Sequence, residues 1–216
     1  MPSTDTLTME DICRISPVVP VVRAPDPDAA VEVAKALVRG GVSVIELTLR
    51  TSTAVESIRA IAEEVPEITL GAGTVVTPEQ VALVVDAGAR FVVSPGSPAA
   101  LQDAVHDEGI PALLGAATVT EMLELASRGW RTVKFFPAED AGGARYLSNL
   151  RGPLPDLQFC PTGGINQANV RDYLALPNVP CVGGSWITPE SAVAAGDWAR
   201  IEELAGEISS LRGTVS

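Results

Sequence analysis

The sequence is poor in the side chains on which many enzyme sites depend. It has a single histidine, His106, among 216 residues. This histidine stands beside Asp107 in a stretch of helical pattern, and we interpret it as a solvated side chain. The count excludes a histidine-based triad and a histidine-rich metal site. No group of carboxylates has the spacing of a magnesium site, so we expect no metal.

Cysteine is almost as scarce, with Cys13, Cys160 and Cys181 the only three. An odd number of widely spaced cysteines, none in a C-x-x-C arrangement, predicts neither a disulfide framework nor a zinc site. We expect them to be buried and to act as small apolar side chains.

Positive charge is also in short supply, because 15 basic residues face 27 acidic ones and the net charge is −12. This balance excludes nucleic-acid binding through a general basic surface. An anionic substrate would need a few basic groups focused at one place. No apolar run approaches the ~20 residues that span a bilayer. The first ten residues lack the basic and apolar regions of a signal peptide, so we predict a cytoplasmic protein with no membrane partner.

The residues that are present form a repeating pattern. Hydrophobic residues make up 46% and aromatics only 4%, which is typical of α/β proteins with aliphatic strands. A short apolar run, a cluster of Gly, Pro, Ser or Thr, and a helix-like segment recur along the chain. Eight runs are predicted as strands: 18–22, 42–49, 68–73, 91–94, 112–115, 132–136, 158–161 and 181–183.

Helices are predicted between these strands, beginning with residues 26–40, which open with Asp-Pro and end in Gly-Gly. In Thr77-Pro78, Ser97-Pro98 and Thr188-Pro189, a capping hydroxyl precedes a proline at the expected first helical position. The other predicted helices are 4–14, 52–65, 78–87, 98–106, 119–127, 167–174 and 197–211.

Eight strands that alternate with helices indicate parallel pairing. Either a (β/α)8 TIM barrel or an open doubly wound sheet would satisfy this order. The barrel is favoured, since the count is eight, no dinucleotide fingerprint follows the first strand and no linker divides the chain. We therefore predict a single domain, 1–216, with a short N-terminal helix. Catalytic groups should then lie at the C-terminal ends of the strands.

One of only two lysines, Lys134, interrupts an apolar strand. Burial of an amine disfavours its charged form, and a neutral amine can attack a ketone. Phe136, two residues on, shares its face and would help to exclude water. Glu46 on another strand could reach across the barrel and exchange protons with the amine. The alternative is a buried Glu46–Lys134 ion pair with no catalytic role.

Other strand ends carry groups suited to anions. Arg50 shares a face with Glu46, and its guanidinium matches a carboxylate. Thr74 follows Gly-Ala-Gly, where small residues let a ligand approach, and Arg23 ends the first strand. Taken singly, each arginine could be a solvated side chain and Thr74 a turn residue.

Two glycine pairs end the last two strands, in Thr162-Gly163-Gly164 and Gly183-Gly184-Ser185. Bare backbone N–H groups near helix N-termini can cradle an anion, and in barrels these two loops are a frequent phosphate site. The alternative is turn geometry alone.

Together these motifs resemble those of the class I aldolases for 2-keto-3-deoxy-6-phosphogluconate (KDPG), which also cleave 4-hydroxy-2-oxoglutarate (KHG). The likeness covers nearly the whole chain. The matching segments are 17–22 (PVVPVV), 41–51 (GVSVIELTLRT), 71–75 (GAGTV), 93–96 (VSPG), 133–139 (VKFFPAE), 159–165 (FCPTGGI), 169–174 (NVRDYL) and 183–186 (GGSW).

The resemblance implies a homotrimeric barrel with no metal or other cofactor. It also implies reversible cleavage of a phosphorylated keto acid to pyruvate and D-glyceraldehyde 3-phosphate. Lys134 would form the Schiff base and Glu46 would be the general acid and base. The other implied roles are carboxylate binding by Arg50 and Thr74, a pyruvate pocket lined by Pro95 and Phe136, phosphate binding by Gly163, Gly164, Gly184 and Ser185, and a mid-substrate contact from Thr162.

Two residues bear on substrate preference. Related phosphogalactonate aldolases tend to carry an apolar residue in place of Thr162, which favours the gluconate epimer here. Arg23 stands where some members have an aliphatic residue, and it could add a second cation near the carboxylate. Three alternatives stay open: an aldolase for the galactonate epimer, a sugar-phosphate-binding module without turnover, and an isomerase or epimerase with Lys134 as a plain base. Intact Lys134 and Glu46 argue against the module.

Overall fold

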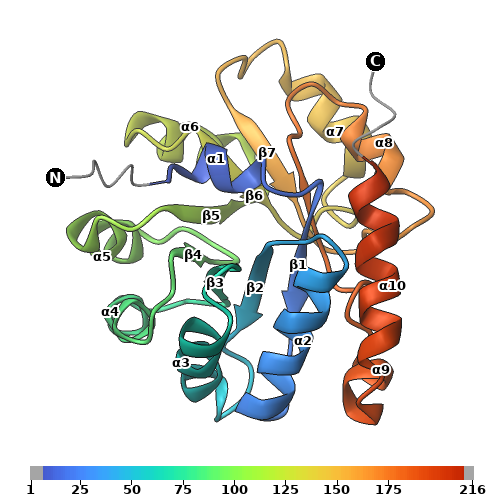
Figure 1. Cartoon of the computed structure of the whole chain (residues 1–216). Coiled ribbons are helices and arrows are strands. Elements are labelled where there is room, and N and C mark those ends of the chain that lie inside the picture. Colours follow the sequence, from blue (N-terminus) through green and yellow to red (C-terminus); the bar gives the residue numbers. More distant parts are fainter. Residues whose placement is uncertain (1–6, 212–216) are drawn as a thin grey trace, which may run out of the picture.

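The computed structural model describes residues 7–211. Eight parallel strands form one sheet in the order β7-β6-β5-β4-β3-β2-β1-β8, surrounded by helices (Figure 1). The strands are β1 (Val18–Val22), β2 (Val44–Thr48), β3 (Thr69–Gly73), β4 (Phe91–Val93), β5 (Ala112–Ala116), β6 (Thr132–Phe135), β7 (Gln158–Pro161) and β8 (Val182–Gly184).

The sheet closes on itself between β7 and β8, the strands at its two ends. β1 pairs with both β2 and β8. A parallel bridge between Thr162 and Gly183 then joins the ends of β7 and β8, and the Phe159 N–H donates to the Asn178 carbonyl at 2.8 Å. The predicted (β/α)8 barrel is confirmed, and the open-sheet alternative is wrong.

Helices follow the strands around the barrel. They are α1 (Met9–Cys13), α2 (Pro27–Arg39), α3 (Ala54–Glu64), α4 (Pro78–Asp86), α5 (Ala99–Glu108), α6 (Val119–Ser127), α7 (Gly143–Leu150), α8 (Val170–Leu174), α9 (Glu190–Ala195) and α10 (Trp198–Ser209). The predicted helix 4–14 corresponds to α1, and its residues 4–6 lie outside the described range. No helix among residues 7–211 is both long and apolar enough to cross a membrane.

One helix, α7, was not predicted, and α9 was predicted only by its start at Thr188-Pro189. α7 begins after Gly142, whose φ is 113°, and its first residue is also a glycine. α9 has six residues and lies between Pro189 and Gly196. Glycine and proline at these boundaries mark loops in a sequence pattern, and only packing against the barrel makes such short segments helical.

The predicted caps are partly confirmed. The side chains of Asp26 and Thr77 accept hydrogen bonds from backbone N–H groups at 2.8 and 3.4 Å. The assignment of Pro98 and Pro189 to first helical positions is wrong. Each is itself the N-cap, with ψ of 146° and 134°, and the helix starts one residue later. Proline fixes φ but leaves ψ free to be extended.

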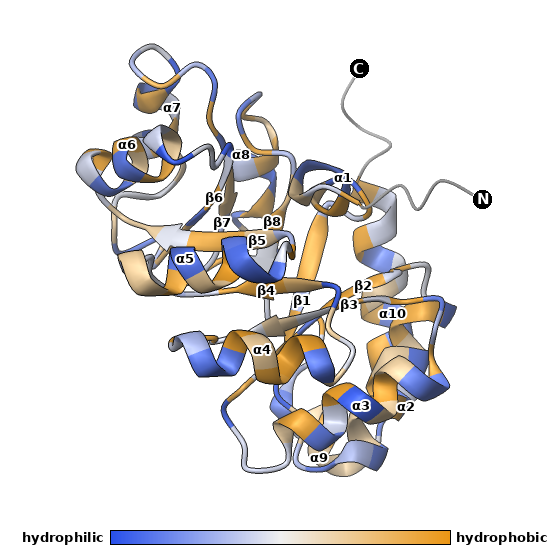
Figure 2. Cartoon of the chain, turned by 90° about the vertical axis from the view of Figure 1, so that its left-hand side faces the viewer, coloured by the Kyte–Doolittle hydropathy of each residue, from blue (hydrophilic) through white to orange (hydrophobic). Residues whose placement is uncertain are grey.

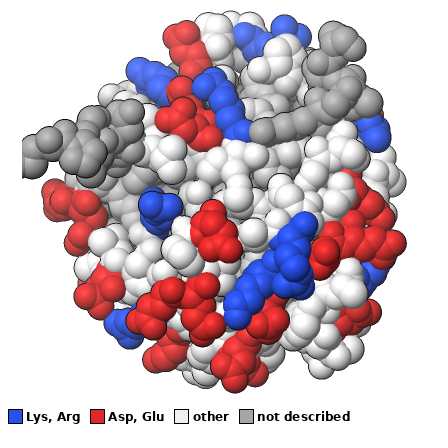
Figure 3. Space-filling model, in the orientation of Figure 1, with Lys and Arg blue, Asp and Glu red and all other residues white. Residues whose placement is uncertain are grey.

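The core is aliphatic, as the composition predicts. The strands and the inward helix faces are the most hydrophobic parts of the chain (Figure 2). Cys13, Cys160 and Cys181 are free and buried, which confirms their expected burial, and each thiol lies close enough to the other two to shift their pKa values. Acidic side chains outnumber basic ones over the face in Figure 3.

Candidate active site

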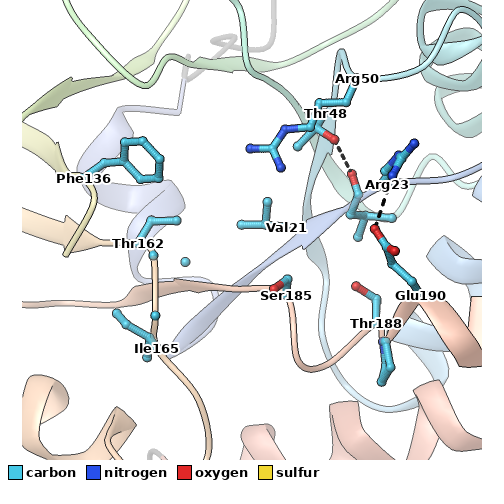
Figure 4. Close-up of a pocket in the computed structure, with 15 residues that line it drawn as sticks. Val21, Arg23, Thr48, Arg50, Phe136, Thr162, Ile165, Ser185, Thr188 and Glu190 are labelled. Carbon is cyan, nitrogen blue, oxygen red and sulfur yellow. Dashed lines mark hydrogen bonds and ion pairs between the residues drawn. The ribbon is translucent and has the colours of Figure 1, made fainter. Parts of the chain in front are cut away.

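A cavity of about 570 Å³ opens at the C-terminal ends of the strands. Its walls come from the ends of β1 and β2 and from the loops after β6, β7 and β8 (Figure 4). The lining residues are Val21, Val22, Arg23, Thr48, Arg50, Phe136, Thr162, Gly163, Gly164, Ile165, Gly183, Ser185, Thr188, Pro189 and Glu190. The cavity therefore lies where a barrel enzyme places its catalytic groups.

Lys134 and Glu46 meet below this cavity. They stand on β6 and β2, four strands apart in the sheet order and thus on opposite walls. Lys134 Nζ lies 3.4 Å from Glu46 Oε1, and their side chains are 6% and 3% exposed. The same nitrogen lies 5.5 Å from the centroid of the Phe136 ring. The two residues singled out from the sequence are brought together, with an aromatic wall beside them.

Burial raises the pKa of Glu46, and the attraction of Lys134 opposes this effect. A carboxyl group with a raised pKa gives up its proton less readily, so the proton between Glu46 and Lys134 can lie on either group. The charged pair and the pair of neutral groups differ by one proton moved across one contact. The buried ion-pair alternative and the catalytic interpretation therefore describe two states of the same geometry. In the neutral state, Lys134 is a nucleophile beside an acid.

Glycines make room for two of the site side chains. A Cβ on Gly73 would lie 2.2 Å from Glu46 Oε1, and a Cβ on Gly183 would lie 2.2 Å from Thr162 Oγ1. The Thr162 hydroxyl is buried and has no hydrogen-bond partner within residues 7–211. Side chains at either glycine would displace polar groups that face the lumen.

Arg50 and Thr74 lie together, as expected for a shared ligand. Arg50 Nε donates to Thr74 Oγ1 at 3.3 Å, and the guanidinium points into the cavity (Figure 4). Thr74 has a φ of 61°, in the left-handed region. This conformation costs a non-glycine residue about 1–3 kcal/mol and concentrates at functional sites.

The glycine loops line the opposite part of the cavity. Gly163 and Gly164 have φ values of 102° and 78°, which favour glycine. Their N–H groups donate to no group in the described part of the chain, so both are open to a ligand. Ser185 follows β8 and also lines the cavity. The Thr162–Gly183 bridge holds the two loops side by side.

The structure places Arg23 away from Arg50. Arg23 Nη1 lies 3.4 Å from Glu190 Oε1, in the first turn of α9. The sequence analysis did not identify Thr188 or Glu190 as cavity residues, and it treated Thr188-Pro189 only as a helix start. Their position directly after the second glycine loop was the available signal. Lys134, Glu46, Thr74, Pro95 and Gly184 do not line the cavity itself.

No group of three or more His, Cys, Asp or Glu residues between residues 7 and 211 could hold a metal ion. The polar groups around the cavity are instead two arginines, hydroxyls, backbone N–H groups and the carboxylate of Glu190. This set suits an organic anion.

Comparison with known proteins identifies the family. The family model for KDPG and KHG aldolases matches residues 9–204. The chain belongs to the KDPG and KHG aldolase family. The KHG/KDPG aldolase of Escherichia coli K12 is 51% identical over 198 residues, which cover 92% of this chain and 93% of that aldolase. The 2-dehydro-3-deoxy-phosphogluconate aldolase of Pseudoalteromonas atlantica is 48% identical over 199 residues, with the same coverage.

Solved aldolase structures share the fold closely. The KDPG aldolase of Legionella pneumophila superposes with a TM-score of 0.91 at 44% identity, over 93% of this chain and 98% of that one. Pyruvate was captured in that aldolase as a covalent carbinolamine. The KDPG aldolase of Zymomonas mobilis with 3-phosphoglycerate has a TM-score of 0.88 at 38% identity, over 93% and 94% of the two chains. As a member of this aldolase family, the chain is a carbon–carbon lyase.

Proposed function

We propose that this aldolase reversibly cleaves KDPG to pyruvate and D-glyceraldehyde 3-phosphate, and also cleaves KHG to pyruvate and glyoxylate. The contact between Lys134 Nζ and Glu46 Oε1 carries the proposal. It puts a potential nucleophile and a proton carrier beside Phe136, at a cavity lined by groups that can bind anions. The names of the relatives support the two substrates, and the captured carbinolamine of the Legionella aldolase supports covalent chemistry.

The first half of the reaction forms a Schiff base. With the shared proton on Glu46, the Lys134 amine attacks the C2 ketone, and its lone pair forms the new C–N bond. The ketone oxygen takes up one proton from the attacking nitrogen and a second from Glu46, and it leaves as water. The product is a protonated imine, whose positive nitrogen can accept an electron pair. Burial supports this sequence, because it raises the pKa of Glu46 and so helps its carboxyl group to act as the acid.

The second half breaks the carbon–carbon bond. Glu46 removes the proton of the C4 hydroxyl through a water molecule. The C4–O bond becomes a carbonyl, the C3–C4 bond breaks, and its electrons neutralise the imine as an enamine. The aldehyde leaves, the enamine carbon is protonated, and hydrolysis releases pyruvate and the free lysine. The imine is the electron sink, so the scheme uses neither a metal nor another cofactor.

The remaining residues would hold the substrate along the cavity. Arg50 and Thr74, joined at 3.3 Å, would take the pyruvate-derived carboxylate. Pro95 and Phe136 would line the pyruvate pocket, and the buried Thr162 hydroxyl would contact a substrate hydroxyl. Gly163, Gly164, Gly184 and Ser185 would bind the phosphate through backbone and hydroxyl donors.

Reductive trapping tests the proposal. The protein is incubated with pyruvate and borohydride, digested and weighed by mass spectrometry. We expect the mass of a reduced pyruvate adduct on the peptide that contains Lys134. Absence of the adduct from folded protein contradicts the Schiff base. It would return the assignment to a binding module or to an isomerase that uses Lys134 as a base.

The galactonate epimer is the second candidate substrate. Thr162 lines the cavity, and it favours the gluconate epimer because related phosphogalactonate aldolases tend to carry an apolar residue in its place. We expect a higher kcat/KM for KDPG than for its C4 epimer, and the reverse order would reassign the preferred substrate.

We also propose a homotrimer that works in the cytoplasm. The family resemblance implies the trimer, and the exposed side chains of Val76, Leu83 and Leu123 are apolar surface that subunit contacts could cover. Three free cysteines suit a reducing compartment. Light scattering coupled to gel filtration should give three times the 22.4 kDa chain mass, and a monomer mass would contradict the trimer.

A further inference from the structure

Arg23 and Glu190 form an ion pair across the mouth of the cavity. Arg23 follows β1, and Glu190 begins α9. Their side chains are 56% and 78% exposed, and the closest nitrogen and oxygen are 3.4 Å apart. Exposed pairs of this kind contribute little to stability, so a stronger anion can displace the carboxylate at small cost.

The pair lies at the phosphate end of the cavity. β1 is in register with β8 through Pro20 and Gly184, which places Arg23 beside the second glycine loop. In Figure 4 both residues lie with Ser185 and Thr188, on the far side of the cavity from Phe136. The charge of Arg50 acts on Glu46, so the reacting pair already has a cation beside it, while Arg23 lies at the other end of the cavity from Phe136.

Thr188 gives an independent sign of a ligand at this place. It is only 6% exposed and lines the cavity. Its hydroxyl is buried and has no hydrogen-bond partner within the described residues. A buried hydroxyl without a partner is costly. A ligand oxygen held between Ser185 and Arg23 would supply the partner.

The charges at this end oppose one another in the free protein. A phosphate monoester carries about −1.5 to −2 charges at neutral pH, and a guanidinium can donate two parallel hydrogen bonds to it. Glu190 occupies the guanidinium and repels an incoming phosphate. A dianionic phosphate outcompetes the single carboxylate for Arg23, whereas a weaker anion does not.

We propose that Arg23, Thr188 and Glu190 form a phosphate-selective latch. In the free enzyme Glu190 holds Arg23, and in the complex the substrate phosphate replaces Glu190 on Arg23 and accepts a hydrogen bond from Thr188. The latch distinguishes phosphorylated from unphosphorylated keto acids. This inference rests on the proposed function for its substrate, and it assigns Arg23 to the phosphate rather than to the pyruvate carboxylate.

Steady-state kinetics on KDPG and KHG test the latch. KHG ends in a carboxylate bonded directly to C4, so it does not reach the phosphate loops. Arg23→Gln should raise the KM for KDPG by about 10-fold or more, the size expected for lost charged hydrogen bonds, with kcat nearly unchanged. Glu190→Gln should lower the KM for KDPG by about two- to fivefold, the range of an exposed ion pair. The KM for KHG should stay nearly constant in both variants.

A double variant and a matched control sharpen the result. With Arg23→Gln in place, the added Glu190→Gln should lower the KM much less than it does alone. Arg59→Gln breaks another exposed ion pair, to Asp86 at 2.9 Å, away from the cavity, and should change neither KM. Equal rises of both KM values in Arg23→Gln, or an unchanged or higher KM for KDPG in Glu190→Gln, overturn the latch.

Binding of inorganic phosphate separates the latch from the catalytic proposal. Calorimetry with phosphate alone needs no turnover. We expect weaker binding in Arg23→Gln and in Thr188→Val, and tighter binding in Glu190→Gln. If the wild-type protein cleaves neither substrate but the variants bind phosphate in this order of affinity, the latch is supported and the proposed function is contradicted. If the wild-type enzyme cleaves KDPG but all variants bind phosphate with equal affinity, only the latch is contradicted.

Discussion

The carboxylate of Glu46 occupies the space that a side chain at Gly73 would fill. A Cβ on Gly73 would lie 2.2 Å from Glu46 Oε1 and 2.6 Å from its Cγ. β2 and β3 are neighbours, in register at Thr48 and Gly73. The position of the proposed acid and base therefore depends on the absence of a side chain on the next strand.

Gly73→Ala should displace Glu46 and lower kcat. The expected loss approaches the about 10²–10⁴-fold that general acid–base groups contribute, because the carboxylate would leave its contact with Lys134. The measurement is kcat on KDPG, with folding checked by circular dichroism. Gly206→Ala is the control, since its Cβ would meet nothing within 4 Å. A folded Gly73→Ala enzyme with normal kcat would show that the placement of Glu46 is not critical.

Lys134→Met should abolish both turnover and the borohydride adduct. Methionine keeps the apolar volume of the side chain but has no amine, so no imine can form. The only other lysine, Lys35, pairs with Glu32 and Glu64 in the α2–α3 region. Lys35→Arg is therefore the control, and it should retain both turnover and the borohydride adduct. Residual trapping of pyruvate in Lys134→Met would place the Schiff base elsewhere.

Glu46→Gln should slow turnover by about 10²–10⁴-fold and change how stability depends on pH. Burial raises the pKa of Glu46, so the folded state binds this proton more tightly than the unfolded state does. The free energy of unfolding of the wild type, relative to the glutamine variant, should therefore fall as pH rises from the ordinary glutamate value to the raised one. Urea unfolding of both proteins from pH 5 to 8 measures this difference, and a rise with pH would mean that Glu46 is stabilised as a carboxylate.

Ser185→Ala should act on binding rather than on chemistry. Loss of a hydroxyl that donates to a phosphate should raise the KM for KDPG by about 10-fold or more, with kcat and the KM for KHG nearly unchanged. Ser210→Ala, on the surface at the end of α10, is a control for a lost hydroxyl. Parallel loss of activity on both substrates would place Ser185 nearer the reacting carbons.

Much of the fold and of the chemistry could be predicted from local pattern. The bounds of β1 and β7 agree with the predicted runs, because buried parallel strands are short aliphatic segments between breakers. Lys134 was identified because a lysine in such a strand is unusual. Its contact with Glu46 follows from placing both strands in one closed barrel.

What could not be predicted depends on contacts between distant segments. α7, and the extent of α9 beyond its start, could not be predicted, because both segments are too short and too rich in flanking glycine and proline to be helices by propensity alone. Glu190 gains its importance only from Arg23, 167 residues away along the chain. The three cysteines looked unrelated in the sequence, yet their thiols lie together in the fold.

That cluster of thiols has a practical consequence. All three sulfur atoms of the chain's cysteines are shielded from solvent, so a bulky aromatic disulfide reagent has no target while the barrel stays shut. The coloured product of the reagent would form only as molecules unfold, and three equivalents would form per chain. Reaction of the native cysteines with this reagent therefore measures unfolding of the barrel without an added dye or an engineered label.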